Sequence, residues 1–311
     1  MKRLATLFVR CTGVLLLMFI LIGPHSVMAK QGANTWWVPG DFSTIQKAIE
    51  SDDVKDGDTL RVGPGIFEGA EVTKGVHIVG VGKTVIDSGP AGPLDLEYGF
   101  WLQEGSDGAS ISHITFAVGF GVYGKPDYDV TVDGKPANDV TVDHCRFINN
   151  FQAITNWGGS NWDIHHNTIV NVITVGDEGG IGGTPILIAG QEGAAVVRDN
   201  VVAHNSVTGE VLFDPDDDGS EGNIWAIGMA YVGAEAISGN LVTHNRVNLV
   251  SNRPDLRKVV PFVLADFTAS SSPCDVIHDN VITKNDFRGP SIQFEVSPTD
   301  LWNCNLIYKN R

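Results

Sequence analysis

Acids, histidines and an arginine recur at one position of a repeated segment, and together they could carry acid–base chemistry. The segments mostly end in asparagine and span residues 140–150, 163–171, 195–205, 236–245 and 275–285, with a sixth at 302–310. Two residues before the first Asn of three successive segments, or before its substitute Cys145, stand Asp143, His165 and Arg198. A histidine exchanges a proton near neutral pH, an adjacent acid orients it, and an arginine pairs with a carboxylate. This set predicts a catalytic site for a carbohydrate.

The same alignment supports two other interpretations. One position closer to the aligned Asn stand His144, His166 and Asp199, which have the ligand types of a metal site. The third interpretation is a solvated polar ladder with paired opposite charges, which sheets commonly carry. All three depend on register, because a slip of one residue turns a strand's side chains to the other face.

A second candidate site is acidic. Asp214, Asp216 and Asp218 alternate and are followed by Gly219, which resembles the start of a calcium-binding loop. The twelfth position holds Trp225 rather than the expected Glu, so the full pattern is not met. Calcium is the predicted cofactor here, and a plain acidic loop tip is the alternative.

Three cations occupy the next insert, at Arg253, Arg257 and Lys258. If the inserts stack, these cations face the acidic segment. A loop ion pair is then the simpler interpretation. The functional interpretation is a group that neutralises the carboxylate of a bound uronate sugar.

The spacing of the asparagines predicts the fold that must position these residues. Asn200, Asn240 and Asn280 are forty residues apart, which is typical of one structural unit stacked on copies of itself. Apolar, mostly β-branched residues alternate on either side of the aligned Asn, as in strands. Buried amides satisfy one another only when they stack as a ladder, because an unpaired amide is costly.

Each unit has a further strand upstream, and several of these strands are apolar at every position, such as 184–190, 224–231 and 259–266. A strand of this kind is buried on both faces. One face lies on the core. The inserts 172–183, 206–222 and 246–258 are expected to cover the other face and to form a wall on one side of the coil.

Residues 41–51, 57–69 and 74–89 carry a resemblance to a known family. The chain resembles the right-handed parallel β-helix proteins of the pectin-lyase-like superfamily over about residues 35–311. The resemblance implies an all-β solenoid with a short N-terminal capping helix, in which Ile45, Ala48 and Ile49 face the core. No catalytic signature of the superfamily's methylesterases, polygalacturonases or epimerases transfers to this sequence, so the resemblance says little about function.

The first 29 residues resemble a signal peptide. Lys2, Arg3 and Arg10 precede an apolar run at 14–23, and small residues follow at 27–29. An uncleaved N-terminal anchor is the alternative. Removal of the leader changes the formal charge from −16 to −19 and leaves residues 30–311 as one domain. This negative charge disfavours nucleic acid and anionic lipid as partners, and it disfavours a polyanionic substrate unless a cation intervenes. From the leader we expect a secreted or periplasmic protein with no membrane contact after cleavage.

Three cysteines follow the leader, at Cys145, Cys274 and Cys304. In the repeat alignment, Cys274 and Cys304 are separated by five residues of strand, about 16 Å, which is too far for a disulfide. The sequence therefore predicts no disulfide.

The last coil ends without an evident cap. An open coil end exposes unpaired backbone groups, so we expect the protein to self-associate through this end.

Together these patterns predict an exported β-helix protein that binds a polysaccharide. The sequence leaves open whether the protein also cleaves it, by a lyase or hydrolase reaction. Trp157, Trp162, Trp225, Tyr231 and Trp302 are aromatic residues that could contact sugar rings or pack in the core. The alternative function is a non-catalytic surface, adhesion or scaffold module. An enzyme requires acid, base and cation to converge, whereas a scaffold needs only flat polar ladders.

Overall fold

The computed structural model describes residues 33–92, 96–124, 135–175, 183–191, 193–219, 222–287 and 294–311, and every statement below concerns these residues. The chain divides into two compact units, Met1–Gly32 and Ala33–Arg311. The expected signal peptide therefore lies outside the described residues. Among the described residues, no helix has the length and apolarity that a membrane span requires.

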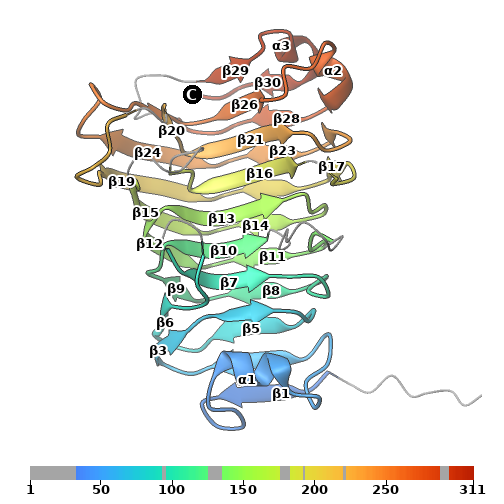
Figure 1. Ribbon diagram of the computed structural model, residues 1–311, viewed down its shortest axis with the longest axis vertical. Helices are drawn as coiled ribbons and strands as arrows, with labels where there is room; N and C mark the ends of the chain where they lie inside the picture. The colour runs from blue at the N-terminus through green and yellow to red at the C-terminus, as the bar shows by residue number, and fades with distance from the viewer. Residues whose placement is uncertain are drawn as a thin grey trace, which may run out of the picture. The chain divides into compact units, whose positions relative to one another are not determined.

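From Ala33 the chain winds as a coil whose turns add strands to three long parallel sheets (Figure 1). Sheet A has ten strands: β1 (Thr35–Val38), β2 (Thr59–Val62), β5 (His77–Gly80), β8 (Ser110–Ser112), β11 (Thr141–Asp143), β14 (Asp163–His165), β18 (Val201–Ala203), β23 (Leu241–Thr243), β28 (Val281–Thr283) and β30 (Leu306–Tyr308). Sheet B has seven: β3 (Gly65–Glu68), β6 (Thr84–Ser88), β9 (Thr115–Phe116), β12 (Arg146–Asn150), β15 (Thr168–Ile173), β19 (Ser206–Leu212) and β24 (Arg246–Ser251).

Sheet C has eight strands: β4 (Ala70–Val72), β7 (Tyr98–Leu102), β10 (Phe120–Gly124), β13 (Gln152–Trp157), β16 (Ile186–Gln191), β21 (Ile227–Val232), β26 (Val263–Asp266) and β29 (Glu295–Ser297). Two smaller sheets consist of β17 (Val197–Arg198), β22 (Ile237–Ser238) and β27 (Ile277–His278), and of β20 (Ile224–Trp225) and β25 (Val259–Val260). The strands of the long sheets pair in parallel throughout, for example β11 with β14 and β16 with β21. The expected all-β parallel β-helix is confirmed.

Inward-facing side chains stack in columns along the coil axis. Val142, Ile164, Val202 and Val242 pair in register on four successive strands of sheet A, and all four are buried. Such columns form because equivalent positions of neighbouring parallel strands face the same side. The alternation seen in the sequence is therefore an alternation between the core and the outer surface.

Helix α1 (Ile45–Glu50) closes the N-terminal end, as expected (Figure 1). It packs against β1, β2 and β4 through its buried residues Ile45, Ala48 and Ile49. The Thr44 hydroxyl accepts a hydrogen bond from the backbone N–H of Lys47 at 3.1 Å, which satisfies a donor at the helix start. The cap thus covers apolar positions of the first coil that would otherwise be exposed.

The outer face of sheet C is buried, as its apolar strands predict. Leu187, Ala189 and Val263 are at most 1% exposed, and they pack with Trp225 of β20 and Val260 of β25. Strands β20 and β25 belong to the segments that follow the inserts. Strands β20 and β25, at the start of the apolar segments 224–231 and 259–266, therefore supply the second cover here. The inserts take part through Ile173 and Val175 of 172–183, which pack against the cluster of Tyr98, Phe120, Tyr123 and Phe151.

Two ladders of asparagine amides run along the coil. The entry ladder precedes the strands of sheet A, and the exit ladder follows them. In both ladders the side-chain amide of one residue donates to the side-chain oxygen of the next at 2.8–3.0 Å; the entry ladder comprises Asn200, Asn240, Asn280 and Asn305, and the exit ladder Asn167, Asn205, Asn245, Asn285 and Asn310. The predicted stacking at forty-residue spacing is confirmed.

The predicted register between the second and third segments is wrong. Asn167 stacks on Asn205 and not on Asn200, and the place equivalent to Asn200 is held by Trp162, whose backbone N–H donates to the Asn200 side chain at 2.8 Å. The segment 163–171 has only the exit asparagine at these two positions, whereas later segments have both. Alignment on the first Asn therefore displaced the later segments by five residues.

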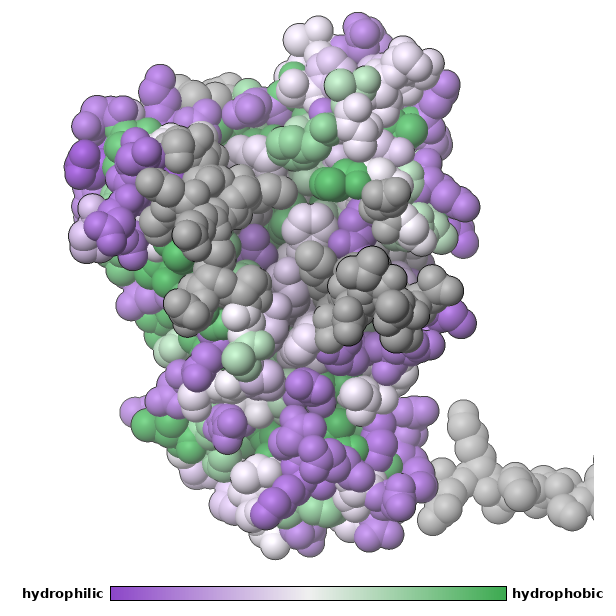
Figure 2. Space-filling model, viewed as in Figure 1, coloured by the Kyte–Doolittle hydropathy of each residue, from purple (hydrophilic) through white to green (hydrophobic). Residues whose placement is uncertain are grey.

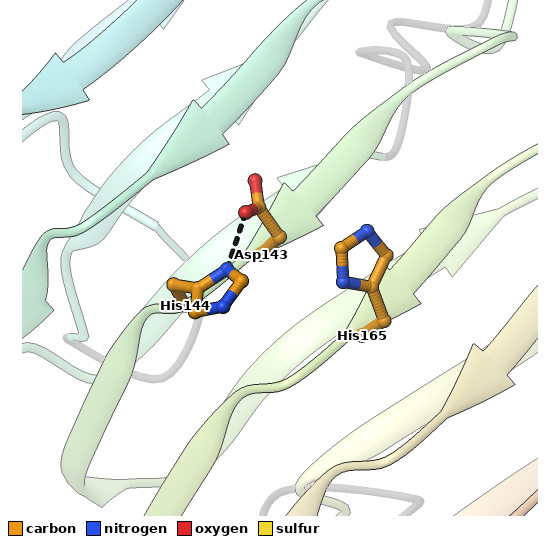
Figure 3. Close-up of side chains that lie close together, drawn as sticks. All are labelled: Asp143, His144 and His165. Carbon is orange, nitrogen blue, oxygen red and sulfur yellow. Dashed lines mark hydrogen bonds and ion pairs between the residues drawn. The ribbon is translucent and has the colours of Figure 1, made fainter.

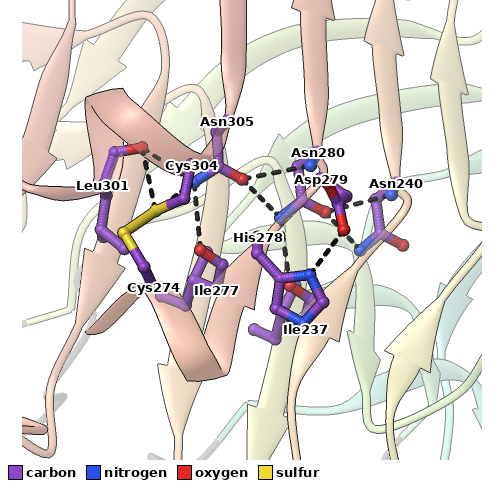
Figure 4. Close-up of polar contacts among 10 residues, drawn as sticks. All are labelled: Ile237, Asn240, Cys274, Ile277, His278, Asp279, Asn280, Leu301, Cys304 and Asn305. Carbon is purple, nitrogen blue, oxygen red and sulfur yellow. Dashed lines mark hydrogen bonds and ion pairs between the residues drawn. A yellow bond between two sulfur atoms is a disulfide. The ribbon is translucent and has the colours of Figure 1, made fainter. Parts of the chain in front are cut away.

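The prediction that no disulfide forms is also wrong, because Cys274 and Cys304 are bonded, with their Cα atoms 5.7 Å apart (Figure 4). The two cysteines lie on α2 (Pro273–Val276) and α3 (Leu301–Cys304), which contact each other. The prediction assumed an extended strand, but a helical turn rises only about 1.5 Å per residue. The free thiol expected from the odd count is Cys145, which is buried.

The last coil ends at β30, an edge strand of sheet A. Trp302, Leu306 and Tyr308 are 44%, 62% and 45% exposed. Self-association through this end remains a prediction.

Candidate functional site

The structure brings two of the three predicted catalytic residues together. Asp143 of β11 and His165 of β14 are register partners on sheet A, and their inward neighbours Val142 and Ile164 are buried, so both side chains face outward. Arg198 does not join them. The residue beside His165 on the next strand is Ala203.

Arg198 lies instead on β17, where it pairs with Ser238 of β22. Its side chain is 64% exposed, and its guanidinium lies 3.4 Å from the carboxylate of Asp199. The predicted position beside His165 is thus wrong, for the reason already given: the alignment took the entry asparagine of one segment for the exit asparagine of another. A catalytic role for Asp143 and His165 stays a prediction that no longer includes this cation.

The hydrogen bonds of the pair differ from the expected ones. The Asp143 carboxylate contacts Nδ1 of His144 at 2.6 Å, rather than the ring of His165 (Figure 3). Nε2 of His165 lies 3.7 Å from the carboxylate of Asp163, and its Nδ1 lies 3.0 Å from Nδ1 of His166. Asp143 therefore orients His144, and His165 sits between a carboxylate and a second imidazole.

The alternative metal set of His144, His166 and Asp199 is not assembled by these contacts. The rings of His144 and His166 stack with centroids 5.2 Å apart, but Asp199 belongs to the turn that enters sheet A, and the histidines belong to the turn that leaves it. Among the described residues, one group of three places potential ligand atoms within 4.8 Å of one another, and it comprises Asp143, His144 and His165.

The sequence analysis missed a column of histidines along the turn between sheets A and B. Neighbouring rings in this histidine column stack with centroids 4.9–5.3 Å apart, and its members are His113, His144, His166, His204 and His244. Lys284 and Lys309 occupy the same turn position in the last two coils, each directly before an exit-ladder asparagine. The signal was present as a basic residue before the second Asn of the last four segments, at His204, His244, Lys284 and Lys309, but the alignment used the first Asn.

The exit ladder explains why these side chains line up. Each member of the column has a positive φ, between 52° and 59°, a left-handed conformation that few non-glycine residues adopt. Beside them, the amide of Asn205 donates to Asn245 at 3.0 Å and to the carbonyl of Ile164 at 2.8 Å. Because these buried bonds hold every turn in one shape, each histidine projects outward at the spacing of the coil.

Positive charge gathers at this turn on a chain whose formal net charge is −16. Two arginines, Arg146 and Arg246, follow the histidine column on exposed positions of sheet B. We call the histidine column together with Lys284, Lys309, Arg146 and Arg246 the basic corner.

Mutual repulsion within the column affects its protonation. Burial and then the neighbouring rings of His244, His166 and His165 hold the pKa of His204 below its ordinary value. The neutral form of the His204 ring is therefore favoured, and this ring gains a proton only as the pH falls below the ordinary histidine range. A bound anion would oppose this repulsion and favour the charged form.

The predicted calcium ligands lie on a different part of the molecule. Asp216 and Asp218 are exposed and Asp214 is half-buried, and the side chain of Asp214 accepts a hydrogen bond from the backbone of Asp216 at 2.9 Å. The arrangement orders the loop without showing a ligand shell. Calcium binding there stays a prediction.

The neighbouring Asp217 has a structural partner. Its carboxylate accepts from Nε of Arg257 at 2.8 Å, and both side chains are fully buried. The expectation that the cationic insert faces the acidic one is confirmed for this residue. Arg253 instead lies 3.6 Å from Asp255 of its own loop.

Most of the aromatic residues singled out in the sequence serve packing. Trp162, Trp225 and Tyr231 are 1%, 9% and 7% exposed, and Trp157 is half-buried. Trp302 is exposed at the last coil. The histidine column, rather than an aromatic strip, is therefore the extended chemical feature of the surface.

No protein-family model matches this chain, and no curated protein sequence does. A similar solved structure is the alginate lyase from Paenibacillus sp. str. FPU-7, with 14% identity and a TM-score of 0.50, over 89% of this chain and 98% of that one. A second is ybhc of Escherichia coli, with 13% identity and a TM-score of 0.28, over 82% of this chain and 73% of that one. At this identity the first likeness shows the shared β-helix fold, and the second is too weak to support an argument.

Proposed function

We propose that this protein is exported and binds an acidic polysaccharide along the basic corner. The observation that carries the proposal is the histidine column, continued by Lys284 and Lys309, on a chain that is otherwise strongly acidic. A uronate polysaccharide bears one carboxylate on each sugar, and ammonium, guanidinium and imidazolium groups form charge-assisted hydrogen bonds with carboxylates. A linear polyanion matches a linear row of cations.

Sheet C offers a poorer surface for a glycan. Its outer residues Leu187 and Val263 are fully buried and pack with Trp225 of β20 and Val260 of β25. Figure 2 shows that, on the face in view, hydrophobic residues form small patches separated by hydrophilic ones. The basic corner, in contrast, has exposed histidines on several successive coils.

The substrate class receives support from the structural neighbour, which is named an alginate lyase. Alginate is an acidic polysaccharide, so its chemistry agrees with that of the basic corner. The neighbour's identity to this chain is low, and the proposal therefore rests on the residues of the corner.

Binding can be tested by affinity electrophoresis in gels that contain either alginate or an uncharged polysaccharide. Wild-type protein is expected to be retarded by alginate alone. The double variant Lys284→Asn/Lys309→Asn should bind alginate roughly tenfold more weakly, because exposed ion pairs contribute up to about 1 kcal/mol each. Asparagine is chosen because it tolerates the left-handed conformation of these positions.

Arg198→Gln is the matched control, since Arg198 is an exposed cation outside the basic corner. It should bind alginate as the wild type does. Binding that is unchanged in the lysine double variant would contradict the assignment to the corner. A protein that binds no glycan at all would favour the non-catalytic surface or scaffold module.

Cleavage of the glycan is a second candidate function, and the short contact between Asp143 and His144 favours it. A carboxylate that orients an imidazole prepares it for proton transfer, and His165 supplies a second imidazole nearby. Loss of a proton-transfer group typically lowers a rate by about 100-fold or more. Product formation, followed as unsaturated sugar for a lyase or as new reducing ends for a hydrolase, should therefore fall by this factor in His165→Ala.

A further inference from the structure

We infer that Asp143, His144 and His165 form a binding site for a divalent transition-metal ion, with Zn²⁺ as the best match. Each residue offers one ligand atom, and the three atoms lie within 4.8 Å of one another (Figure 3). The residues come from two adjacent coils, through strands β11 and β14 and the turn after β11. The parallel register, which is held by the column beneath, brings them together.

The ligand atoms can reach the spacing of a zinc site by small changes in distance. Four ligands around zinc at about 2.0–2.1 Å lie about 3.4 Å from one another. The ring of His144 is 51% exposed and that of His165 is 25% exposed, so both can rotate without disturbing the core. The 2.6 Å hydrogen bond between Asp143 and His144 is shorter than this spacing, so it must open when both residues bind the ion, which a turn of the exposed His144 ring allows.

Groups around the site can hold His165 in a binding orientation. A metal-bound imidazole usually donates its other N–H to an acceptor. The two ring nitrogens of His165 have an acceptor on either side: Asp163 lies 3.7 Å from Nε2, and His166 lies 3.0 Å from Nδ1. Nδ1 is within hydrogen-bond distance of His166, whereas Nε2 is not within that distance of Asp163, so Nε2 can bind the ion while Nδ1 stays hydrogen-bonded.

The ligand types indicate the class of ion. Two imidazoles and one carboxylate suit Zn²⁺, Co²⁺ or Ni²⁺, whereas Ca²⁺ and Mg²⁺ prefer oxygen ligands alone. Three protein ligands leave at least one coordination position for water or a ligand atom. The site lies on the open face of sheet A, where an incoming molecule can reach that position.

The inference does not require that the protein binds a glycan. Zinc binding is measured on the protein alone, and alginate binding is measured in EDTA with variants of Lys284 and Lys309. Failure of one proposal therefore leaves the other intact.

Zinc and acid–base catalysis compete for the same histidines, because a bound metal uses the nitrogen lone pairs that proton transfer would need. Added Zn²⁺ should therefore inhibit any cleavage that depends on free His165.

The test is calorimetric titration of ZnCl₂ into full-length protein that carries no affinity tag and has been freed of metal with EDTA. We expect one tight site near neutral pH. His165→Ala should weaken binding by at least about tenfold, because an entire ligand is lost. Alanine already stands beside His165 in the next coil, as Ala203, so the fold should accept it. His144→Asn should have a similar effect and keeps the left-handed turn.

The pair His278 and Asp279 provides a matched control. Nδ1 of His278 lies 2.8 Å from the Asp279 carboxylate, as in the pair of His144 and Asp143, but neither residue belongs to a described group of three ligands. His278→Ala should leave zinc binding unchanged. Co²⁺ should give visible absorption bands of a low-coordinate nitrogen and oxygen site, and His165→Ala should remove them.

Three results would overturn the inference. They are the absence of a zinc site, binding that survives in both His165→Ala and His144→Asn, and loss of binding only when His204 and His244 are replaced. The last result would move the metal to another part of the column. Calcium that binds at the acidic loop would be recognised separately by its loss in Asp216→Asn.

Discussion

Sheets A and C are built by the same turns of the coil, yet their outer faces differ completely. The outer face of sheet C is buried under β20 and β25, where Leu187 and Val263 pack against Trp225 and Val260. The outer face of sheet A remains open and carries Asp143 and His165. Since both sheets share one core, the segments packed outside sheet C decide which face adds stability and which is available for chemistry.

Two carboxylate contacts of similar length illustrate the same difference. Asp217 and Arg257 are joined at 2.8 Å with both side chains fully buried, whereas Asp143 and His144 are joined at 2.6 Å with the histidine 51% exposed. A buried charge without its partner is very costly, and an exposed charge is solvated by water. We expect substitutions in the closed region to change stability and those on the open face to change binding.

The largest expected effect follows from removal of the buried arginine. Arg257→Ala leaves the Asp217 carboxylate buried without its ion-pair partner and should lower the free energy of unfolding by about 3–5 kcal/mol. Arg253→Ala removes an exposed arginine that lies 3.6 Å from Asp255 and should cost at most about 1 kcal/mol. Urea unfolding measures both, and equal losses would contradict the division between buried and exposed charges.

A smaller loss of stability is expected from the entry ladder. Asn240 accepts from the backbone N–H and the side-chain amide of Asn200, at 3.0 and 2.8 Å, and donates to Asn280 at 2.8 Å. Asn240→Ala leaves buried donors without an acceptor and should cost about 3 kcal/mol. Thr141→Ala, on the outer side of sheet A, should cost about 0.5 kcal/mol or less in the same assay.

On the open face, pH should control glycan affinity instead of stability. In EDTA, alginate binding should be about tenfold tighter near pH 5.5 than near pH 8, because protonation of the histidines adds charge. His204→Asn/His244→Asn should reduce this ratio and leave the affinity near pH 8 nearly unchanged. A ratio that does not change in the double variant would show that other groups titrate.

The smallest expected effect is on stability below neutral pH. The pKa of His204 is lower in the folded protein than its ordinary value of 6.5, first through burial and then through neighbouring histidines. The unfolded chain therefore binds this proton more readily, and the stability that the neutral ring contributes is present above about pH 6.5 and lost as the pH falls through the folded pKa. In EDTA, His204→Asn should show a smaller decrease in melting temperature between pH 7.5 and 5 than the wild type.

Much of the fold was predictable because the same pattern of apolar residues and asparagines recurs in several segments. Asn200, Asn240 and Asn280 stack as their spacing predicts, and the apolar upstream strands are buried on both faces. Asp143 and His165 are neighbours because their coils align without ambiguity. Arg198 was misplaced because the segment with Asn167 lacks the entry asparagine, and an alignment cannot tell which asparagine is missing.

The amino-acid sequence by itself determined the coil, its core columns and the two amide ladders, because each requires only a periodic supply of residue types. Tertiary structure alone decided which residues of neighbouring coils pair when an insert of irregular length separates two segments. It thereby placed Ala203 instead of Arg198 beside His165, aligned the histidines into a column and bonded Cys274 to Cys304. The physical reason is that side-chain contacts depend on register, and a shift of a few residues leaves the composition of a repeat unchanged while it replaces every neighbour.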